Sequence, residues 1–480
     1  MNANRQDYDL IMVGTGFAST FFLKKYLEKS ADNVKVLVLE RGFPFMRKDR
    51  LGFLQGKKTP DPRFDNDPES YIVNETPDKH WLFTVGHGGS SNCWYACTPR
   101  FMPADFKLKS KYGVGEDWPL DYDELDPFYT EVETLMDISG PAETPFPKKS
   151  SYPLPPHQFT TVDKVLKQKY GSLYISQPTG RASRAVKARN ACCANATCSV
   201  CPVDAKFTIE NSGFGVYEDP RVELKYDARV FALDLKGSVA ERVHYREGEK
   251  DYIVAADVIA LGANALFNAN ILLNSGDGHP LTGKGLGEQY GMDVVVHLKD
   301  FANVGGSTWV NANGYMLYDG EHRREFAACL IESNNAPYIR VERGKWRNLA
   351  TFRMIFEDLP QNRNYVARSE DLFKPVTHFE GISEYTTRAV KNMKEKLPAL
   401  LDCLPVEEIK YMDPFKTEAH ILGTTRMHAD PSLGVVDKHQ VHHRYRNLFV
   451  LGGGSFTTFS PNNPTLTISA LSLYSAEKLF

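Results

Sequence analysis

The sequence of 480 residues lacks several features that would place it in a specialised class of protein. No apolar run approaches the roughly 20 residues that a membrane-spanning helix needs. Lys and Arg number 57 against 60 Asp and Glu, a formal net charge of -3, so neither nucleic acid nor an acidic membrane surface is expected as a partner. The opening MNANRQDYDL lacks the basic-then-apolar order of a secretory signal. We therefore expect a cytoplasmic protein, or one exported while bound to a partner that carries a signal.

Cysteine is scarce outside one stretch of the chain. Eight cysteines are too few for a disulfide-stabilised scaffold of this length. Four of them lie in CCANATCSVCP, residues 192–202: Cys192, Cys193, Cys198 and Cys201. Thiolates at this spacing suit zinc or an iron–sulfur cluster, and the spacing alone does not separate the two. Disulfides and free thiols are the remaining alternatives.

The N-terminal region has the pattern of a dinucleotide-binding βαβ unit. A strand is expected in YDLIMVG (8–14), a helix in TFFLKKYLEKS, and a second strand in VKVLVLERG (34–42). The turn between the first strand and the helix reads G-x-G-x-x-S, with Gly14 for the tight turn and Gly16 for close approach to a pyrophosphate. Ser19 takes the place of a third small residue, and Glu40 ends the second strand, where an acid binds ribose hydroxyls. The pattern predicts a dinucleotide site in an α/β fold, without distinguishing NAD from FAD.

Four further segments give the sequence a family resemblance. They are VGHGGSSNCWYACTPRF (85–101), AADVIALGANALFNANILLNSG (255–276), EAHILGTTRM (418–427) and NLFVLGGGSFTTFSPNNPTLTISALSLYSAEKLF (447–480). In this order they resemble the glucose–methanol–choline (GMC) family of FAD-dependent oxidoreductases over nearly the whole chain. The resemblance implies a discontinuous Rossmann-type FAD domain in residues 1–300 and a sheet-based substrate domain in 301–410. Residues 411–480 would return to the FAD domain, and the loop 44–80 and the cysteine segment 186–206 would be attached to it.

The resemblance also implies the residues of the site. Oxidation of an alcohol needs a base for the hydroxyl proton and an acceptor for the hydride. His420 falls at the position of the family's base, and Asn463 at a position that hydrogen-bonds the substrate oxygen; Asn462 is the less favoured neighbour. The cofactor-binding residues expected in this way are Gly14, Gly16, Ser19, Glu40, Arg41, Gly88, Gly89, Ser90, Asn92, Trp94, Val230, Gly262, Gly453 and Thr465.

One local feature bears on how the cofactor is attached. Pyranose oxidases, which have a similar run, carry a flavin-linked histidine before the tryptophan, whereas this sequence has Cys93 before Trp94. We therefore expect non-covalent FAD, with a cysteinyl link at Cys93 as a remote alternative.

Four histidines lie close together near the end of the sequence: His428, His439, His442 and His443. Their spacing does not match metal ligands on a clear helix or strand, so we expect a solvated loop rather than a metal cluster.

The cysteine segment resembles a motif in bacterial glucose and fructose dehydrogenase catalytic subunits, where it holds a [3Fe–4S] cluster, although the last gap here is one residue shorter. This resemblance favours [3Fe–4S], with [4Fe–4S] as the alternative. It implies a dehydrogenase that acts on a sugar, polyol or related alcohol and passes electrons to a cytochrome or quinone-linked protein, with a small escort subunit. The main alternative is an oxidase that uses O₂ and has structural or zinc-binding cysteines. A flavin-containing lyase and a non-catalytic flavoprotein are further alternatives.

Overall fold

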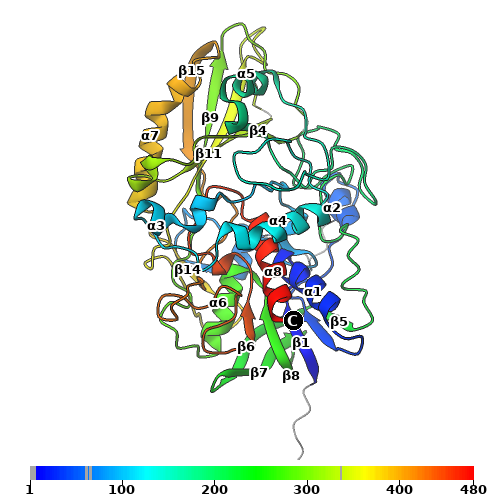
Figure 1. Ribbon diagram of the computed structural model, residues 1–480. Helices are drawn as coiled ribbons and strands as arrows, with labels where there is room; N and C mark the ends of the chain where they lie inside the picture. The colour runs from blue at the N-terminus through cyan, green and yellow to red at the C-terminus, as the bar shows by residue number, and fades with distance from the viewer. Residues whose placement is uncertain (1–6, 60–62, 64–66, 307, 336–337) are drawn as a thin grey trace, which may run out of the picture.

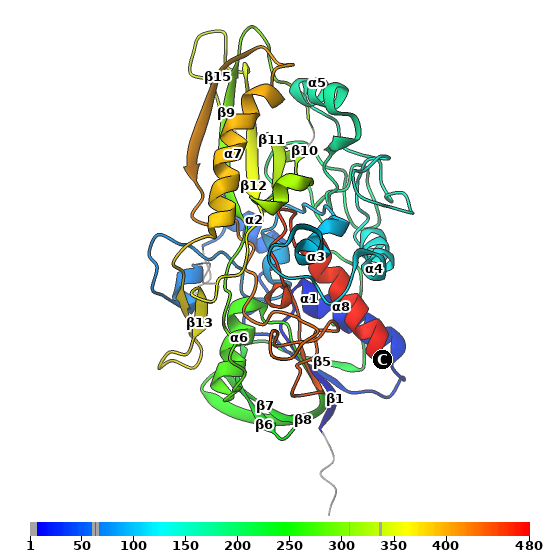
Figure 2. The ribbon, with the colours of Figure 1, turned by 60° about the vertical axis from the view of Figure 1, so that its left-hand side comes forward.

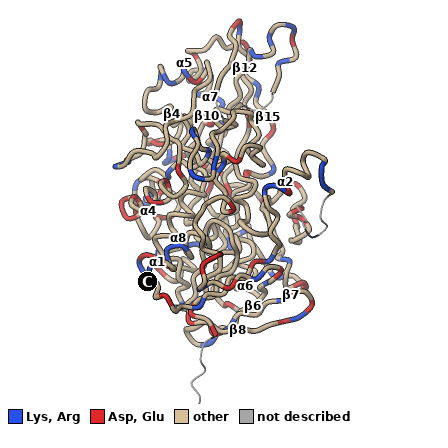
Figure 3. Tube along the Cα trace, turned by 90° about the vertical axis from the view of Figure 1, so that its right-hand side faces the viewer, with Lys and Arg blue, Asp and Glu red and all other residues tan. Residues whose placement is uncertain are grey.

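The computed structural model describes residues 7–59, 63, 67–306, 308–335 and 338–480. The first six residues and part of the segment 44–80 therefore lie outside the described residues. Two large sheets lie one above the other, and the chain passes between them several times (Figure 1). Charges of both signs are distributed over both sheet regions (Figure 3).

The lower sheet is the predicted dinucleotide-binding sheet. Within the described residues it has seven strands, in the order β5-β2-β1-β8-β7-β6, with β16 also paired to β8. The pairs of β1 with β2 and β8, of β2 with β5, and of β16 with β8 are parallel, whereas β6, β7 and β8 form an antiparallel meander. The strands are β1 (Tyr8–Val13), β2 (Val36–Leu39), β5 (Val222–Lys225), β6 (Ala228–Lys236), β7 (Val239–Glu247), β8 (Lys250–Leu261) and β16 (Leu448–Val450).

Apolar helices cover this sheet because its central strands are apolar on both faces. Leu10, Ile11 and Met12 of β1 are fully buried, which requires a cover on each side. Helix α1 (Phe17–Lys29) packs along α8 (Thr465–Leu479), so the last helix lies beside the first (Figure 2). Helices α4 (Tyr122–Leu135) and α6 (Asn264–Asn274) add to the layers. The predicted β1–α1–β2 unit, the strand and helix in 255–276 and the closing helix are confirmed.

The upper sheet combines strands from distant parts of the chain. Their order is β15-β9-β12-β11-β10-β4. Neighbouring strands in this order are antiparallel. Helices α5 (Thr161–Tyr170) and α7 (Glu384–Leu400) pack on it through Val162, Leu166, Ala389 and Met393. The strands are β4 (Tyr174–Ser176), β9 (Tyr290–Leu298), β10 (Val310–Leu317), β11 (Cys329–Asn334), β12 (Leu349–Phe356) and β15 (Val406–Pro414).

The upper sheet recruits more of the chain than residues 301–410. Strands β4 and β9 precede residue 301, and β15 runs past residue 410. A small third sheet joins β3 (Val73–Asn74), from the 44–80 segment, to β14 (Val376–His378) and β13 (Tyr365–Ala367). The remaining α-helices of the described residues are α2 (Arg47–Leu54) and α3 (Leu108–Tyr112). None of the described helices is both long and apolar enough to cross a membrane.

Candidate active site

A cavity of about 700 Å³ lies between the two sheets. This volume is within the range of about 300–1,000 Å³ that is typical of small-molecule and cofactor sites. The lower sheet contributes Val13 and Leu39, which end β1 and β2, and the upper sheet contributes Val310, Glu332 and Ile355. Ligands of open α/β sheets bind outside the carboxyl ends of the strands, which is where this cavity lies.

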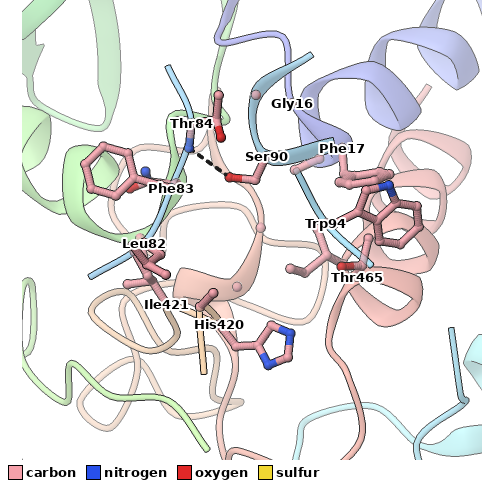
Figure 4. A pocket seen from close by; sticks show the side chains of 18 of the residues that line it. Gly16, Phe17, Leu82, Phe83, Thr84, Ser90, Trp94, His420, Ile421 and Thr465 are labelled. Carbon is pink, nitrogen blue, oxygen red and sulfur yellow. Dashed lines mark hydrogen bonds between the residues drawn. The ribbon is translucent and has the colours of Figure 1, made fainter. Parts of the chain in front are cut away.

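Most of the predicted cofactor and catalytic residues line this one cavity, although they come from distant parts of the chain (Figure 4). Ser19, Gly88 and Asn92 are predicted residues outside the lining, and they support the loops behind it: Ser19 donates to Val13 O and Asn92 Nδ2 donates to His87 O. The predicted residues in the lining are Gly14, Gly16, Glu40, Arg41, Gly89, Ser90, Trp94, Val230, Gly262, Gly453, Thr465, His420 and Asn463.

The glycine turn has no room for a side chain at Gly14. Gly14 has φ +91°, and a Cβ there would lie 2.7 Å from the carbonyl oxygen of Gly262. A Cβ on Gly262 would in turn lie 2.0 Å from Ser19 Oγ. The two glycines and the serine therefore form one tight contact between β1, α1 and β8, and the small side chain of Ser19 is part of it. Gly16 differs, since a Cβ there would meet nothing within 4 Å.

Glu40 ties the glycine turn to the loop around residue 88. Its Oε2 accepts from Thr15 N at 3.0 Å and from Thr15 Oγ1 at 2.7 Å. Its Oε1 accepts from Gly42 N at 2.9 Å and from Gly86 N at 3.2 Å. Gly88 N donates to Thr15 Oγ1 at 3.0 Å, which places Gly88 in the same network. The carboxylate thus shapes the wall of the cavity.

Arg41 brings an unused donor to the cavity wall. Its guanidinium lies 5.0 Å from the ring centre of Tyr71 and 4.7 Å from that of Phe267, and Nη1 donates to Phe373 O at 3.0 Å. Its Nε finds no hydrogen-bond partner among the described residues. Burial lowers the pKa of Arg41 to about 10, so the group is still a cation at neutral pH. A cation with a spare N–H suits a polar or anionic ligand group.

His420 lies at the opposite side of the cavity from the glycine turn. Ala419, with φ 60°, turns the chain directly before it. Burial, with a smaller contribution from the Arg353 charge, lowers the pKa of His420 to about 4. The imidazole is therefore neutral at neutral pH and able to accept a proton.

Gln289 fixes which nitrogen of His420 is free. Gln289 Nε2 donates to the backbone oxygens of Ser460 at 2.8 Å and Asn462 at 3.1 Å. Because carbonyl oxygens only accept, the amide nitrogen must face them, and the amide oxygen Oε1 then faces His420 Nδ1 at 3.1 Å. The Nδ1 atom must carry the hydrogen, which leaves Nε2 as the unprotonated, basic atom.

The two candidate asparagines differ in their surroundings. Asn462 is fully buried, and its Nδ2 donates to Arg100 O. Asn463 is 8% exposed, lines the cavity, and its Oδ1 has no hydrogen-bond partner within the described part of the chain. Asn463 therefore has the unused polar atom at the cavity, and Gln289 connects its segment to His420.

An ion pair lies behind His420. Lys79 Nζ contacts Glu288 Oε1, and Glu288 Oε2 accepts from His420 N at 3.2 Å and from Thr417 Oγ1 at 3.1 Å. Both side chains are buried, and burial lowers the pKa of Lys79 to about 7. Lys79, Glu288 and Gln289 had no signal in the sequence, because the first lies in a segment without pattern and the other two directly precede the apolar run of β9.

The cysteine segment is attached to the cavity wall. Lys206 Nζ donates to Ser199 O at 2.8 Å, to Asn92 O at 3.1 Å and to Trp94 O at 2.9 Å, and its burial lowers its pKa to about 8. Arg181 Nη1 donates to Cys198 Sγ at 3.4 Å. Lys206 therefore ties the cysteine segment to the loop that carries Asn92 and Trp94, and Arg181 contacts one of its thiols.

The described geometry does not gather the thiols into a ligand set. Cys198 is buried, Cys193 is exposed, and Cys192 and Cys201 are half-buried. No group of three or more His, Cys, Asp or Glu side chains in the described part of the chain is arranged to hold a metal ion.

The loop with the four histidines is only partly as expected. His442 is fully buried, with Nε2 3.4 Å from Asp277 Oδ2, so the prediction of a solvated position was wrong for this residue.

Comparisons with known proteins agree with this geometry. A GMC oxidoreductase family model matches residues 362–472, which include His420 and Asn463. The fructose dehydrogenase large subunit of Gluconobacter japonicus is 26% identical, over 98% of this chain and 97% of that protein. Residues 362–472 thus match the GMC oxidoreductase model, and the chain is similar to named GMC enzymes over nearly its whole length. Paromamine 6'-oxidase of Streptomyces fradiae is 24% identical over 98% of this chain and 91% of its own length. The crystal structure of pyridoxine 4-oxidase from Mesorbium loti has the same fold, with a TM-score of 0.65, 16% identity and coverage of 98% and 99%.

GMC oxidoreductases bind FAD, and the residues of this cavity fit that cofactor. Gly16, the N-cap of α1, lines the cavity with open space beside it, which suits a pyrophosphate at the helix N-terminus. Arg41 Nε and Asn463 Oδ1 lack partners among the described residues, as expected for groups that contact a ligand. Residues at the glycine turn, at Glu40 and Arg41 and in the 85–94 loop would hold the dinucleotide.

Proposed function

We propose that the chain oxidises a CH–OH group of a sugar, polyol or related alcohol. The observation that carries the proposal is a neutral His420, held with Nε2 unprotonated, in the cavity that fits FAD. The names of the relatives support the substrate class, since they include fructose dehydrogenase and 2-methyl-1,2-propanediol dehydrogenase.

The residues supply the proton chemistry and the orientation. His420 Nε2 takes the hydroxyl proton of the substrate. Bound FAD would supply the acceptor for the hydride that leaves the carbon bearing this hydroxyl. Asn463 Oδ1 or its amide nitrogen holds the substrate oxygen in register. A general base of this kind accelerates the reaction by a factor of about 10²–10⁴.

Anaerobic single-turnover bleaching of the flavin tests this role. We expect His420→Ala to slow bleaching by about 10²–10⁴ while FAD content is unchanged. His378→Ala is the matched control, because His378 pairs with Glu75 and Glu380 outside the cavity. An H420A variant that bleaches as fast as the parent across the pH range would contradict the proposal.

We propose further that the enzyme is a dehydrogenase whose cysteine segment carries an iron–sulfur cluster, [3Fe–4S] or [4Fe–4S]. Four thiols in ten positions, the two nearby cations and the Lys206 link to the cavity wall support it. The relative's name, a large subunit, supports a smaller partner subunit, and the proposal adds a protein partner that accepts electrons. The cluster would pass electrons singly to that partner.

The second candidate is an oxidase, which the names pyridoxine 4-oxidase and paromamine 6'-oxidase favour. Protein purified without oxygen distinguishes the two. A cluster predicts iron and sulfide in the protein and an EPR signal that is lost in Cys198→Ser. Zinc without iron, or hydrogen peroxide formed in step with product, favours the oxidase.

A further inference from the structure

The end of the cavity beneath the upper sheet carries a row of charged side chains. Glu332 of β11 is directly opposite Arg353 of β12, and Arg353 is directly opposite Asp293 of β9. Side chains of directly paired residues lie on the same face of a sheet. Glu418, two residues before His420, approaches the same guanidinium from the loop, with Oε2 at 3.7 Å from Arg353 Nη1.

The row has more acid than base. Arg353 Nε is 3.2 Å from Asp293 Oδ1, so one guanidinium is shared by three carboxyl groups. Two other buried cations lie nearby, but among the described residues neither forms an ion pair with an acid of this row. Lys79 pairs with Glu288, and Arg181 donates to Gln177, Thr179, Val310 O and Cys198. The site would therefore gain from one more positive charge.

Two of the acids, Glu332 and Glu418, are buried and have few hydrogen-bond donors around them. Glu332 and Glu418 are 3% and 8% exposed, and burial raises the pKa of each to about 7. Glu332 Oε1 accepts from Gln177 Nε2 at 3.0 Å. Glu418 Oε1 is buried without a hydrogen-bond partner among the described residues, and it fills the place where Gly291 would carry a Cβ. An unpaired buried carboxyl oxygen costs stability unless a ligand satisfies it.

These acids belong to the reacting end of the cavity. Glu332, Arg353 and Glu418 line the same cavity as His420 and Asn463. The stacked rings of Tyr95 and Trp309, 5.5 Å apart between centroids, form an aromatic wall there. Aromatic faces and carboxylates both attract cations, whereas an anionic substrate would be repelled.

We propose that this end of the cavity binds a protonated amine, so that the preferred substrate is an amine-bearing polyol or amino sugar. The inference rests on the proposed alcohol oxidation and names the substrate class of the same site. Glu332 and Glu418 hold the ammonium group, while His420 and Asn463 hold the hydroxyl that reacts.

Binding to the holoenzyme tests the inference without any turnover. Calorimetric titration compares 3-amino-1,2-propanediol with glycerol, which differ only in the amine, and with glycerate as the anion. We expect the amine to bind at least tenfold more tightly than glycerol, and glycerate more weakly than either. Glu332→Gln and Glu418→Gln should each reduce the preference at least threefold. Glu384→Gln, whose side chain is 97% exposed, is the matched control and should retain it.

The outcomes separate this inference from the proposed function. Equal or weaker binding of the amine, no binding of either compound, or a preference that survives the Glu332→Gln/Glu418→Gln double variant would overturn the inference. If the melting temperature shows that a variant is unfolded, the parent titrations alone decide. Flavin bleaching by neutral alcohols that needs His420 would still support the proposed function in each of those cases.

Discussion

The two ends of the cavity are built by different means. The lower end is made mainly of backbone, with Gly14 and Gly262 in contact and the Glu40 carboxylate binding N–H groups. The upper end is made of side chains, with Glu332 and Arg353 presented by neighbouring strands and Glu418 by a loop. The difference separates a cofactor end, whose shape depends on backbone contacts, from a substrate end, whose shape depends on side chains.

The largest expected effect is at the backbone end. Gly14→Ala adds a Cβ 2.7 Å from Gly262 O at φ +91°, so we expect loss of both stability and FAD. Gly16→Ala meets nothing within 4 Å, so the apoprotein should stay as stable as the parent while FAD binds more weakly. The melting temperature of the apoprotein and the ratio of flavin to protein absorbance measure the two effects.

Gly278→Ala is the control, since a Cβ at this position also meets nothing within 4 Å, and it is not part of the cavity lining. Equal melting temperatures for the Gly14→Ala and Gly16→Ala apoproteins would show that the tight contact between Gly14 and Gly262 contributes nothing to the fold.

The next effect is at the ion pair behind His420. Lys79→Met leaves Glu288 buried without its cation, and breaking a buried pair in this way costs about 3–5 kcal/mol. We expect a large fall in the free energy of unfolding, measured in urea. The double variant Lys79→Met/Glu288→Gln removes the uncompensated charge and should recover part of the loss. No recovery would mean that the loss of the cation–π contact of Lys79 Nζ with Trp81, 4.5 Å from the ring centre, is the cause.

A smaller and more specific effect is expected at Gln289. Gln289→Glu places a carboxylate beside His420 Nδ1, which stabilises the imidazolium and raises the pKa of His420 from about 4. The acidic limb of the kcat/KM profile should move to higher pH, because the base is lost on protonation. Gln289→Leu removes the acceptor that keeps the hydrogen of His420 on Nδ1. We expect kcat to fall by about tenfold with little change in KM. A profile that does not move in Gln289→Glu would mean that His420 is not the titrating base.

The sequence predicted the backbone end better than the side-chain end, for a physical reason. The contacts at Gly14, Ser19 and Glu40 lie within one βαβ unit, so their spacing along the chain reflects their geometry. Glu332, Arg353 and Asp293 meet only through strand register, and Gln289 meets His420 across more than a hundred residues. The position of β9 in the upper sheet was likewise not visible in its apolar run.

The smallest effect is expected at Cys93, which also lines the cavity. Its Sγ lies 2.9 Å from Thr84 Oγ1, and the residue is exposed. Since we expect non-covalent FAD, acid precipitation should leave a white pellet and a yellow supernatant, and Cys93→Ser should keep the flavin content of the parent. A yellow pellet from the parent and a white one from Cys93→Ser would instead establish a cysteinyl bond. The flavin would then be held by a side chain as well as by the backbone, and the contrast between the two ends would no longer hold.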